Sequence, residues 1–146
     1  TRPILIEVQA LVTASVYSSP SRRCSGFDQN RLVLLLAVLE KRVGYQLHNR
    51  DVFLSIAGGL RVVEPAIDLA AVIAISSSLS NRKVDPETVV LGGEVRSVTR
   101  IETRLKEAVT MGFRRAVIPK RDMIKVPNLE IIGVERVEQA IEATLS

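Results

Sequence analysis

Strand-like and helix-like segments alternate along this chain, most regularly in its second half. Short runs rich in β-branched residues predict strands at residues 4–13, 51–57, 89–91, 94–98, 114–119 and 129–134. Longer runs with apolar residues at helical spacing predict helices at residues 29–44, 65–79, 99–112 and 135–145. Such alternation is typical of α/β or α+β domains, in which helices pack on a mixed sheet. We therefore expect this fold class, with residues 1–146 forming a single domain.

The expected helices carry their own boundary signals. Asp28 stands where a side chain caps the first helix, and Gly44 follows its basic C-terminal turn. Pro65 occupies the first position of the second helix, where its missing N–H costs nothing. Thr99 and Glu102 have the T-x-x-E spacing of a capping box at the start of the third helix.

Positive charge is concentrated in the N-terminal part of the chain. Residues 1–63 hold eight Lys or Arg against four Asp or Glu, whereas residues 64–146 hold twelve of each. The Ser- and Pro-rich segment ASVYSSPSRR, residues 14–23, predicts a polar, basic and mobile loop. Because clustered cations attract phosphates, we infer a candidate set for contact with phosphates such as those of a nucleic acid, with a solvated basic face as the alternative. The set consists of Arg22, Arg23, Arg31, Lys41 and Arg42.

Several kinds of chemistry are disfavoured by the sequence. Cys24 is the only cysteine, and no His/Cys cluster or calcium-loop pattern occurs, so we expect no metal site. His48 lies in a polar stretch, where a solvated loop histidine is the favoured interpretation. The Gly-Gly pairs at 58–59 and 92–93 lack the following Lys and Ser or Thr of an ATP-binding loop. No segment approaches the roughly 20 apolar residues of a membrane span.

Five ordered words carry a family resemblance: RPILIEVQALV, GFDQNRLVLLLAVLEKRVG, DVFLSIAGGLRVVEPAIDLA, GEVRSVTRIETRLKEA and GFRRAVIPK. Together they cover nearly the whole chain, and they resemble the C-terminal Lon-protease-like domain of the RadA (Sms) family of bacterial DNA repair proteins. The resemblance implies the α/β fold of Lon proteolytic domains, related to the second domain of ribosomal protein S5. It also implies that the chain is a C-terminal fragment of a longer protein. One departure is the hairpin LGGEVR, which is longer in the family.

The same resemblance implies the loss of a catalytic dyad. In active Lon peptidases a D-G-P-S-A-G turn carries the nucleophilic serine, and the corresponding word here, VEPAID, places Ala66 at the serine position. The lysine base is carried by a G-G-x-K-E-K word, where TRIETR places Glu102 instead. We therefore expect no catalytic residue and no peptidase activity in this domain. Asp68, in the first turn of the second helix, is interpreted as a helix-start charge or, alternatively, as a subunit contact.

The function implied by the resemblance is that of a non-proteolytic module in an ATP-driven protein that processes recombination intermediates and promotes branch migration. The family implies a homo-oligomeric ring, a hexamer, that binds DNA and contacts RecA through the parent protein in the bacterial cytoplasm. ATP, Mg²⁺ and Zn²⁺ are implied only for a RecA-like ATPase and a zinc finger that precede this domain in the family. We expect this domain itself to need no cofactor.

Two alternatives stay open from the sequence. One is an active Lon-like peptidase that uses another serine, for which Ser76, Ser77 and Ser78 are the candidates, although they end a helix. The other is a purely structural ring scaffold without DNA affinity. Lys106, the lysine that follows Glu102 by one turn, is interpreted as its partner in an exposed ion pair rather than as a base.

Overall fold

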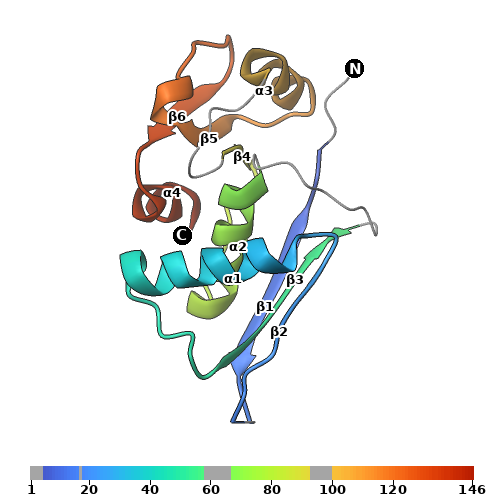
Figure 1. Cartoon of the computed structure of the whole chain (residues 1–146). Coiled ribbons are helices and arrows are strands. Elements are labelled where there is room, and N and C mark those ends of the chain that lie inside the picture. Colours follow the sequence, from blue (N-terminus) through green and yellow to red (C-terminus); the bar gives the residue numbers. More distant parts are fainter. Residues whose placement is uncertain (1–4, 17, 58–66, 93–99) are drawn as a thin grey trace.

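The computed structural model describes residues 5–16, 18–57, 67–92 and 100–146, which have a mixed α/β architecture (Figure 1). The described strands form two three-stranded sheets, one from each half of the chain, and helices pack between and beside them. The α/β class expected from the sequence is confirmed, although two sheets replace the single mixed sheet that we expected. Within the described ranges, no helix is both long and apolar enough to cross a membrane.

The N-terminal sheet consists of β1 (Val8–Ala14), β2 (Arg22–Ser25) and β3 (Arg50–Ile56) in the order β1-β3-β2. β1 runs antiparallel to β3 and β2 runs parallel to it, so this sheet is mixed. Side chains alternate between its faces: Val52 and Leu54 are buried, whereas Leu11 and Phe53 are exposed. One face therefore contributes to the core and the other faces outward.

The predicted mobile loop at residues 14–23 is partly wrong, because Arg22 and Arg23 begin strand β2. Arg22 aligns with Val52 of β3, and the backbone N–H of Ser21 donates to the Asp51 carboxylate at 2.7 Å. The polar sequence RRCS has little intrinsic preference for a strand. Here the free edge of β3 supplies the hydrogen-bond partners, and tertiary pairing overrides the local signal.

The C-terminal sheet consists of β4 (Thr88–Val90), β5 (Arg115–Pro119) and β6 (Glu130–Val134), all parallel, in the order β4-β5-β6. The central strand β5 is buried on both faces, as expected for a covered parallel sheet. On one face Val117 joins the main core. On the other, Ala116 and Ile118 pack with Leu105 of α3 (Ile101–Thr110).

The helices of the main core confirm most sequence expectations. They are α1 (Gln29–Val38), which continues as a π-helical turn over Leu39–Val43, α2 (Asp68–Ser80) and α4 (Val137–Thr144). Gly44 ends the first of these in a left-handed conformation with φ of 84°. Asp28 holds the N-cap position of α1, but its side chain makes no capping hydrogen bond.

Two predicted helix starts lie partly outside the described residues. Pro65 and Thr99 belong to the ranges 58–66 and 93–99, so their own placement lies outside the described residues. The described starts differ from the predicted ones: α2 begins at Asp68 after the N-cap residue Ile67, and α3 begins after the N-cap residue Arg100, which puts Glu102 at N2 rather than at the N3 position of a capping box. The strand predicted at residues 94–98 also falls in this part of the chain. Among the described residues, α3 has Arg100 at its N-cap position, and Glu102 lies in its first turn.

A polar network fastens the loop after α2 to the C-terminal sheet. The Asp85 carboxylate accepts hydrogen bonds from the Glu87 backbone N–H at 3.0 Å and from the Thr88 hydroxyl at 2.8 Å. It also pairs with Arg115 of β5 at 2.8 Å. The Glu87 hydrogen bond, followed by the Thr88 hydroxyl and the Arg115 charge, lowers the pKa of Asp85 from its ordinary value.

Asp85→Asn tests this network through the pH dependence of stability. Because the folded-state pKa of Asp85 is depressed, its contribution is present above the unfolded pKa of about 3.9 and is lost as pH falls through the folded value. Thermal unfolding should show a lower Tm for the variant at pH 7, and the difference should shrink toward about pH 2. Glu40→Gln, on the exposed surface of the π-helical turn, is the control. An equal Tm difference at both pH values would contradict the assignment.

Candidate functional site

The head of α2 is the place where the resemblance puts a lost nucleophile. Ala66 itself lies outside the described residues, so its surroundings are not described. Glu102, at the lysine position, is an exposed side chain whose carboxylate lies 2.9 Å from the Lys106 ammonium group, within α3. This confirms the predicted i,i+4 pair. A solvent-exposed carboxylate already paired with its neighbour is poorly suited to serve as a general base.

Asp68 is held by an ion pair inside the chain. The Arg31 guanidinium of α1 donates to the Asp68 carboxylate at the start of α2, and both side chains are largely buried. Arg31 also lies over the Phe27 ring, 5.1 Å from its centroid. Burial lowers the pKa of Arg31, and the charge of Asp28 opposes this shift, but a guanidinium stays protonated. Arg31 and Asp68 therefore join α1 to the head of α2.

A close backbone contact holds the same helix start from the other side. The carbonyl of Gly92, after β4, accepts a hydrogen bond from the Leu69 backbone N–H at 2.9 Å. A Cβ at Gly92 would lie 3.1 Å from the Pro119 ring and 3.2 Å from the Leu69 side chain, so the position favours glycine. In the described residues this glycine serves packing, and the fit to a phosphate-binding loop is poor.

The serines proposed for an alternative nucleophile make structural contacts. Ser78 accepts a hydrogen bond from the Val12 backbone N–H of β1 at 2.9 Å, and Ser77 donates to the Arg82 carbonyl at 2.6 Å. Ser76 is fully buried. The three hydroxyl groups thus lie within the packing of α2 rather than in an open turn.

The five predicted DNA-binding residues differ in their availability. Arg22 donates to the Leu47 carbonyl at 2.6 Å, and Arg31 is engaged with Asp68. Arg23, Lys41 and Arg42 are exposed, and none of these three forms an ion pair within the described part of the chain. The structure therefore leaves three of the five cations open to a ligand.

These three cations do not form one compact cluster. Arg23 lies on β2, close to the N-terminal end of α1, whereas Lys41 and Arg42 lie at the far end of the same helical segment (Figure 1). Residues 29–43 extend over about 22 Å at 1.5 Å per residue. The arrangement suits an extended polyanion better than a single phosphate. His48, near this end, is exposed in a loop, as predicted.

A cleft missed by the sequence analysis opens where the two halves of the molecule meet. Its volume is about 230 Å³, and it lies at the carboxyl ends of β5 and β6, beside α1 and the head of α2. Its lining is mostly aliphatic, with charged side chains among the residues that follow the two strands. It is lined by Leu35, Val38, Asp68, Leu69, Val72, Pro119, Lys120, Arg121, Val134, Glu135, Arg136 and Val137.

A sequence signal for this cleft exists. Both strands end in a short charged word, Lys120 and Arg121 after β5 and Glu135 and Arg136 after β6. Parallel strands place their carboxyl ends at one edge of a sheet, which is where ligands bind in open α/β folds. The two charged segments lie close together because β5 and β6 are neighbouring strands, and this strand order is known only from the structure.

The resemblance implies zinc only for a domain that precedes this one. Among the described residues, no three His, Cys, Asp or Glu side chains gather to hold a metal ion. Cys24 of β2 is not in a disulfide, and its thiol donates a hydrogen bond to the Phe27 carbonyl at 2.9 Å. The described ranges therefore provide no zinc site.

Comparison with known proteins decides the relationship. No family model matches the chain. Two curated proteins, from Halalkalibacterium halodurans and Bacillus subtilis and both called DNA repair protein RadA, are 46% identical to it over 153 residues, which covers 99% of this chain. This chain matches DNA repair protein RadA. The RadA of a Synechocystis species is likewise 46% identical over 151 residues, again 99% of this chain.

The match concerns a C-terminal part of RadA. The chain spans about a third of the length of these RadA relatives, namely 34%, 33% and 30% of the three proteins. The expected resemblance is thereby confirmed.

Proposed function

We propose that this chain is the non-proteolytic DNA-binding and oligomerisation module of a RadA-type DNA repair protein, with the fold of Lon proteolytic domains. The observation that carries the proposal is the 46% identity to RadA over 99% of the chain. In this proposal the parent protein processes recombination intermediates by ATP-driven branch migration in the bacterial cytoplasm. Its ATP, Mg²⁺ and Zn²⁺ chemistry and any contact with RecA belong to parts beyond these residues.

The absence of peptidase chemistry is supported by the side chains at the expected sites. Ala66 has no nucleophilic atom, and Glu102 carries the wrong charge for a lysine base. Asp68, the described carboxylate nearest in sequence to Ala66, is neutralised by Arg31. The head of α2 is thus supported as a structural element rather than as a reaction centre.

DNA contact is assigned to Arg23, Lys41 and Arg42, the exposed cations of the predicted set. Such cations bind backbone phosphates and release counterions, so affinity is expected to fall steeply with salt and to depend little on sequence. Arg22 and Arg31 do not bind DNA directly in this proposal. They hold β2 and α1, which carry the exposed cations, in place.

The DNA assignment is tested by duplex binding across a range of salt concentrations. Each phosphate contact contributes about 0.9 to the slope of log K against log salt, so the variant Arg23→Ala, Lys41→Ala, Arg42→Ala should lower the magnitude of the slope by up to about 2.7. Lys125→Ala, at an exposed cation in the segment between β5 and β6, is the control. Arg31→Ala should cost stability of about 1–3 kcal/mol while leaving the slope unchanged. An unchanged slope in the triple variant would remove these residues from the interface.

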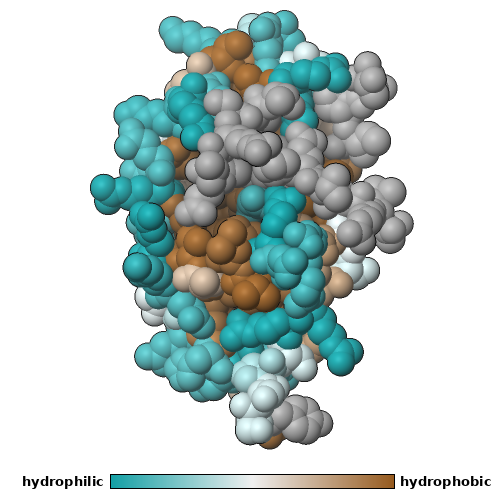
Figure 2. All heavy atoms as spheres, in the orientation of Figure 1, coloured by the Kyte–Doolittle hydropathy of each residue, from teal (hydrophilic) through white to brown (hydrophobic). Residues whose placement is uncertain are grey.

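Ring assembly is supported by an apolar surface on α1. Val33 and Leu34 are 53% and 62% exposed on the helix, and Figure 2 shows hydrophobic surface gathered at the level of α1 between hydrophilic regions. In the proposal this surface packs against a different surface of the next copy. The same contact, repeated from copy to copy, closes a hexameric ring.

Light scattering tests the assembly. The full chain should form a closed oligomer, and Leu34→Asp should shift it toward the monomer because it places a charge in an apolar contact. Val16→Asp is the control, since Val16 is 85% exposed in the loop after β1. A chain that stays monomeric at all concentrations, or an equal effect of both substitutions, would contradict the proposed contact.

A further inference from the structure

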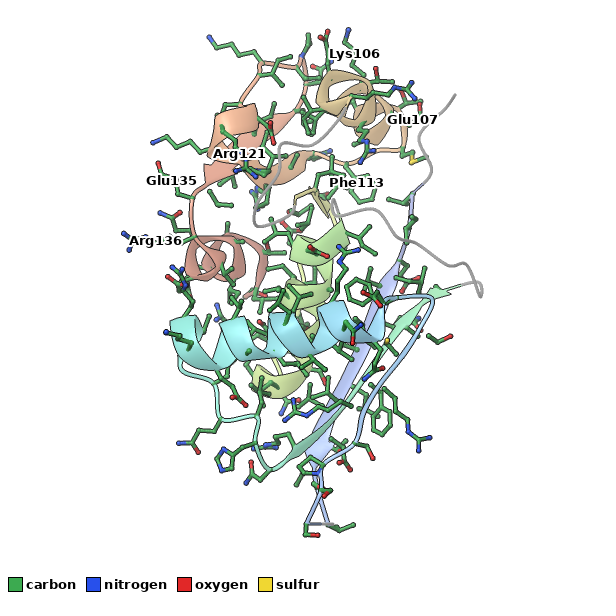
Figure 3. All side chains as sticks on the ribbon, in the orientation of Figure 1. Lys106, Glu107, Phe113, Arg121, Glu135 and Arg136 are labelled. Atoms are coloured by element: carbon green, nitrogen blue, oxygen red, sulfur yellow. The ribbon has the colours of Figure 1, made fainter. Side chains whose placement is uncertain are left out.

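The side chains that line the cleft between the two halves carry an excess of positive charge. Two of its carboxylates are already neutralised, Asp68 by Arg31 and Glu135 by Lys120 at 3.1 Å. Arg121 and Arg136 are exposed, and neither forms an ion pair within the described ranges. Figure 3 shows both side chains in the segments that follow β5 and β6, with Arg136 on the outer side. Two guanidinium groups are therefore available to an anionic ligand.

The walls of the cleft indicate that the ligand also carries an apolar group. Leu35 and Val38 of α1, Leu69 and Val72 of α2 and Val137 of α4 make an aliphatic lining without an aromatic ring. Its volume of about 230 Å³ is below the roughly 300–1,000 Å³ of typical small-molecule sites, so a single bulky side chain suits it better than a nucleotide. A base would find no ring on which to stack.

We propose that this cleft binds a segment of a protein partner in which one bulky apolar side chain is flanked by carboxylates. The apolar side chain enters between α1, α2 and α4, and Arg121 and Arg136 bind the carboxylates. Guanidinium groups bind carboxylates through paired, charge-assisted hydrogen bonds, which fixes the orientation of the segment. None of the DNA-binding residues Arg23, Lys41 and Arg42 lines the cleft, so the cleft adds a protein contact to the proposed module.

The probe is a fluorescein-labelled peptide, Gly-Ser-Asp-Glu-Leu-Glu-Asp-amide, titrated against the full chain by fluorescence anisotropy. One control peptide replaces Leu by Ser, and another replaces every acid by its amide. A third peptide ends in a free Leu carboxylate without acidic side chains, which distinguishes a terminal carboxylate from side-chain carboxylates. Amide chemical shifts of the ¹⁵N-labelled chain locate the bound peptide.

Binding of the acidic Leu peptide should weaken about tenfold in Arg121→Gln and again in Arg136→Gln, because each removes charge-assisted hydrogen bonds. Both residues are exposed, so the variants are expected to fold. Lys125→Gln is the matched control, an exposed cation outside the cleft, and should bind as the unsubstituted chain does. The largest shift changes are expected at Leu69, Val72 and Val137.

Three results would overturn the proposal. The first is equal binding of the Leu and Ser peptides, which would reduce the interaction to charge alone. The second is binding that is unaffected by both arginine substitutions, or shift changes away from the cleft. The third is displacement of the peptide by duplex DNA with shift changes at the cleft residues, which would make the cleft a nucleic-acid surface. None of these results depends on the salt slope measured for the DNA-binding residues.

Discussion

The burial of α2 between the two halves of the molecule is the constraint on which the other features depend. Ala71, Val72, Ile73 and Ile75 are almost wholly buried, and the main core unites them with strands of both sheets. A helix that is apolar on nearly all sides can be stable in water only when it is covered on nearly all sides. The covering by both sheets joins the two halves through the main core, while a second, smaller cluster packs between the C-terminal sheet and α3.

The two ends of α2 are then fixed by polar contacts. At its head Arg31 holds Asp68, and Gly92 accepts a hydrogen bond from Leu69. Beyond its tail Arg82 donates to the Leu145 carbonyl at 3.1 Å, and Asn81 adopts a left-handed conformation that ends the helix. The cleft lies where α1 and the head of α2 meet the carboxyl ends of β5 and β6. The same packing that fixes α2 therefore creates the concave surface proposed for a protein partner.

Local patterns predicted the elements that are stabilised by their own hydrophobic face, but not those that depend on a neighbour. The helical spacing of Leu32, Leu35 and Leu36 predicted α1, and the aliphatic run of β5 predicted a strand, which the structure shows to be buried. β2 was missed because its residues are polar and its strand conformation depends on pairing with β3. The partner of Arg31 was also hidden, since Asp68 lies 37 residues away in sequence. Arg121 and Arg136 became a pair only through the strand order of the C-terminal sheet.

The central proposal is that the head of α2 is retained as architecture, with the charge of Asp68 neutralised inside the chain and no nucleophile in place. The most direct measurement is incubation of the chain with a fluorophosphonate probe and unfolded casein, followed by mass spectrometry of both proteins. We predict no probe adduct on any serine and intact casein, because Ser76 is buried and Ser77 and Ser78 hydrogen-bond to the backbone. An adduct on one of these serines together with cleaved casein would contradict the account.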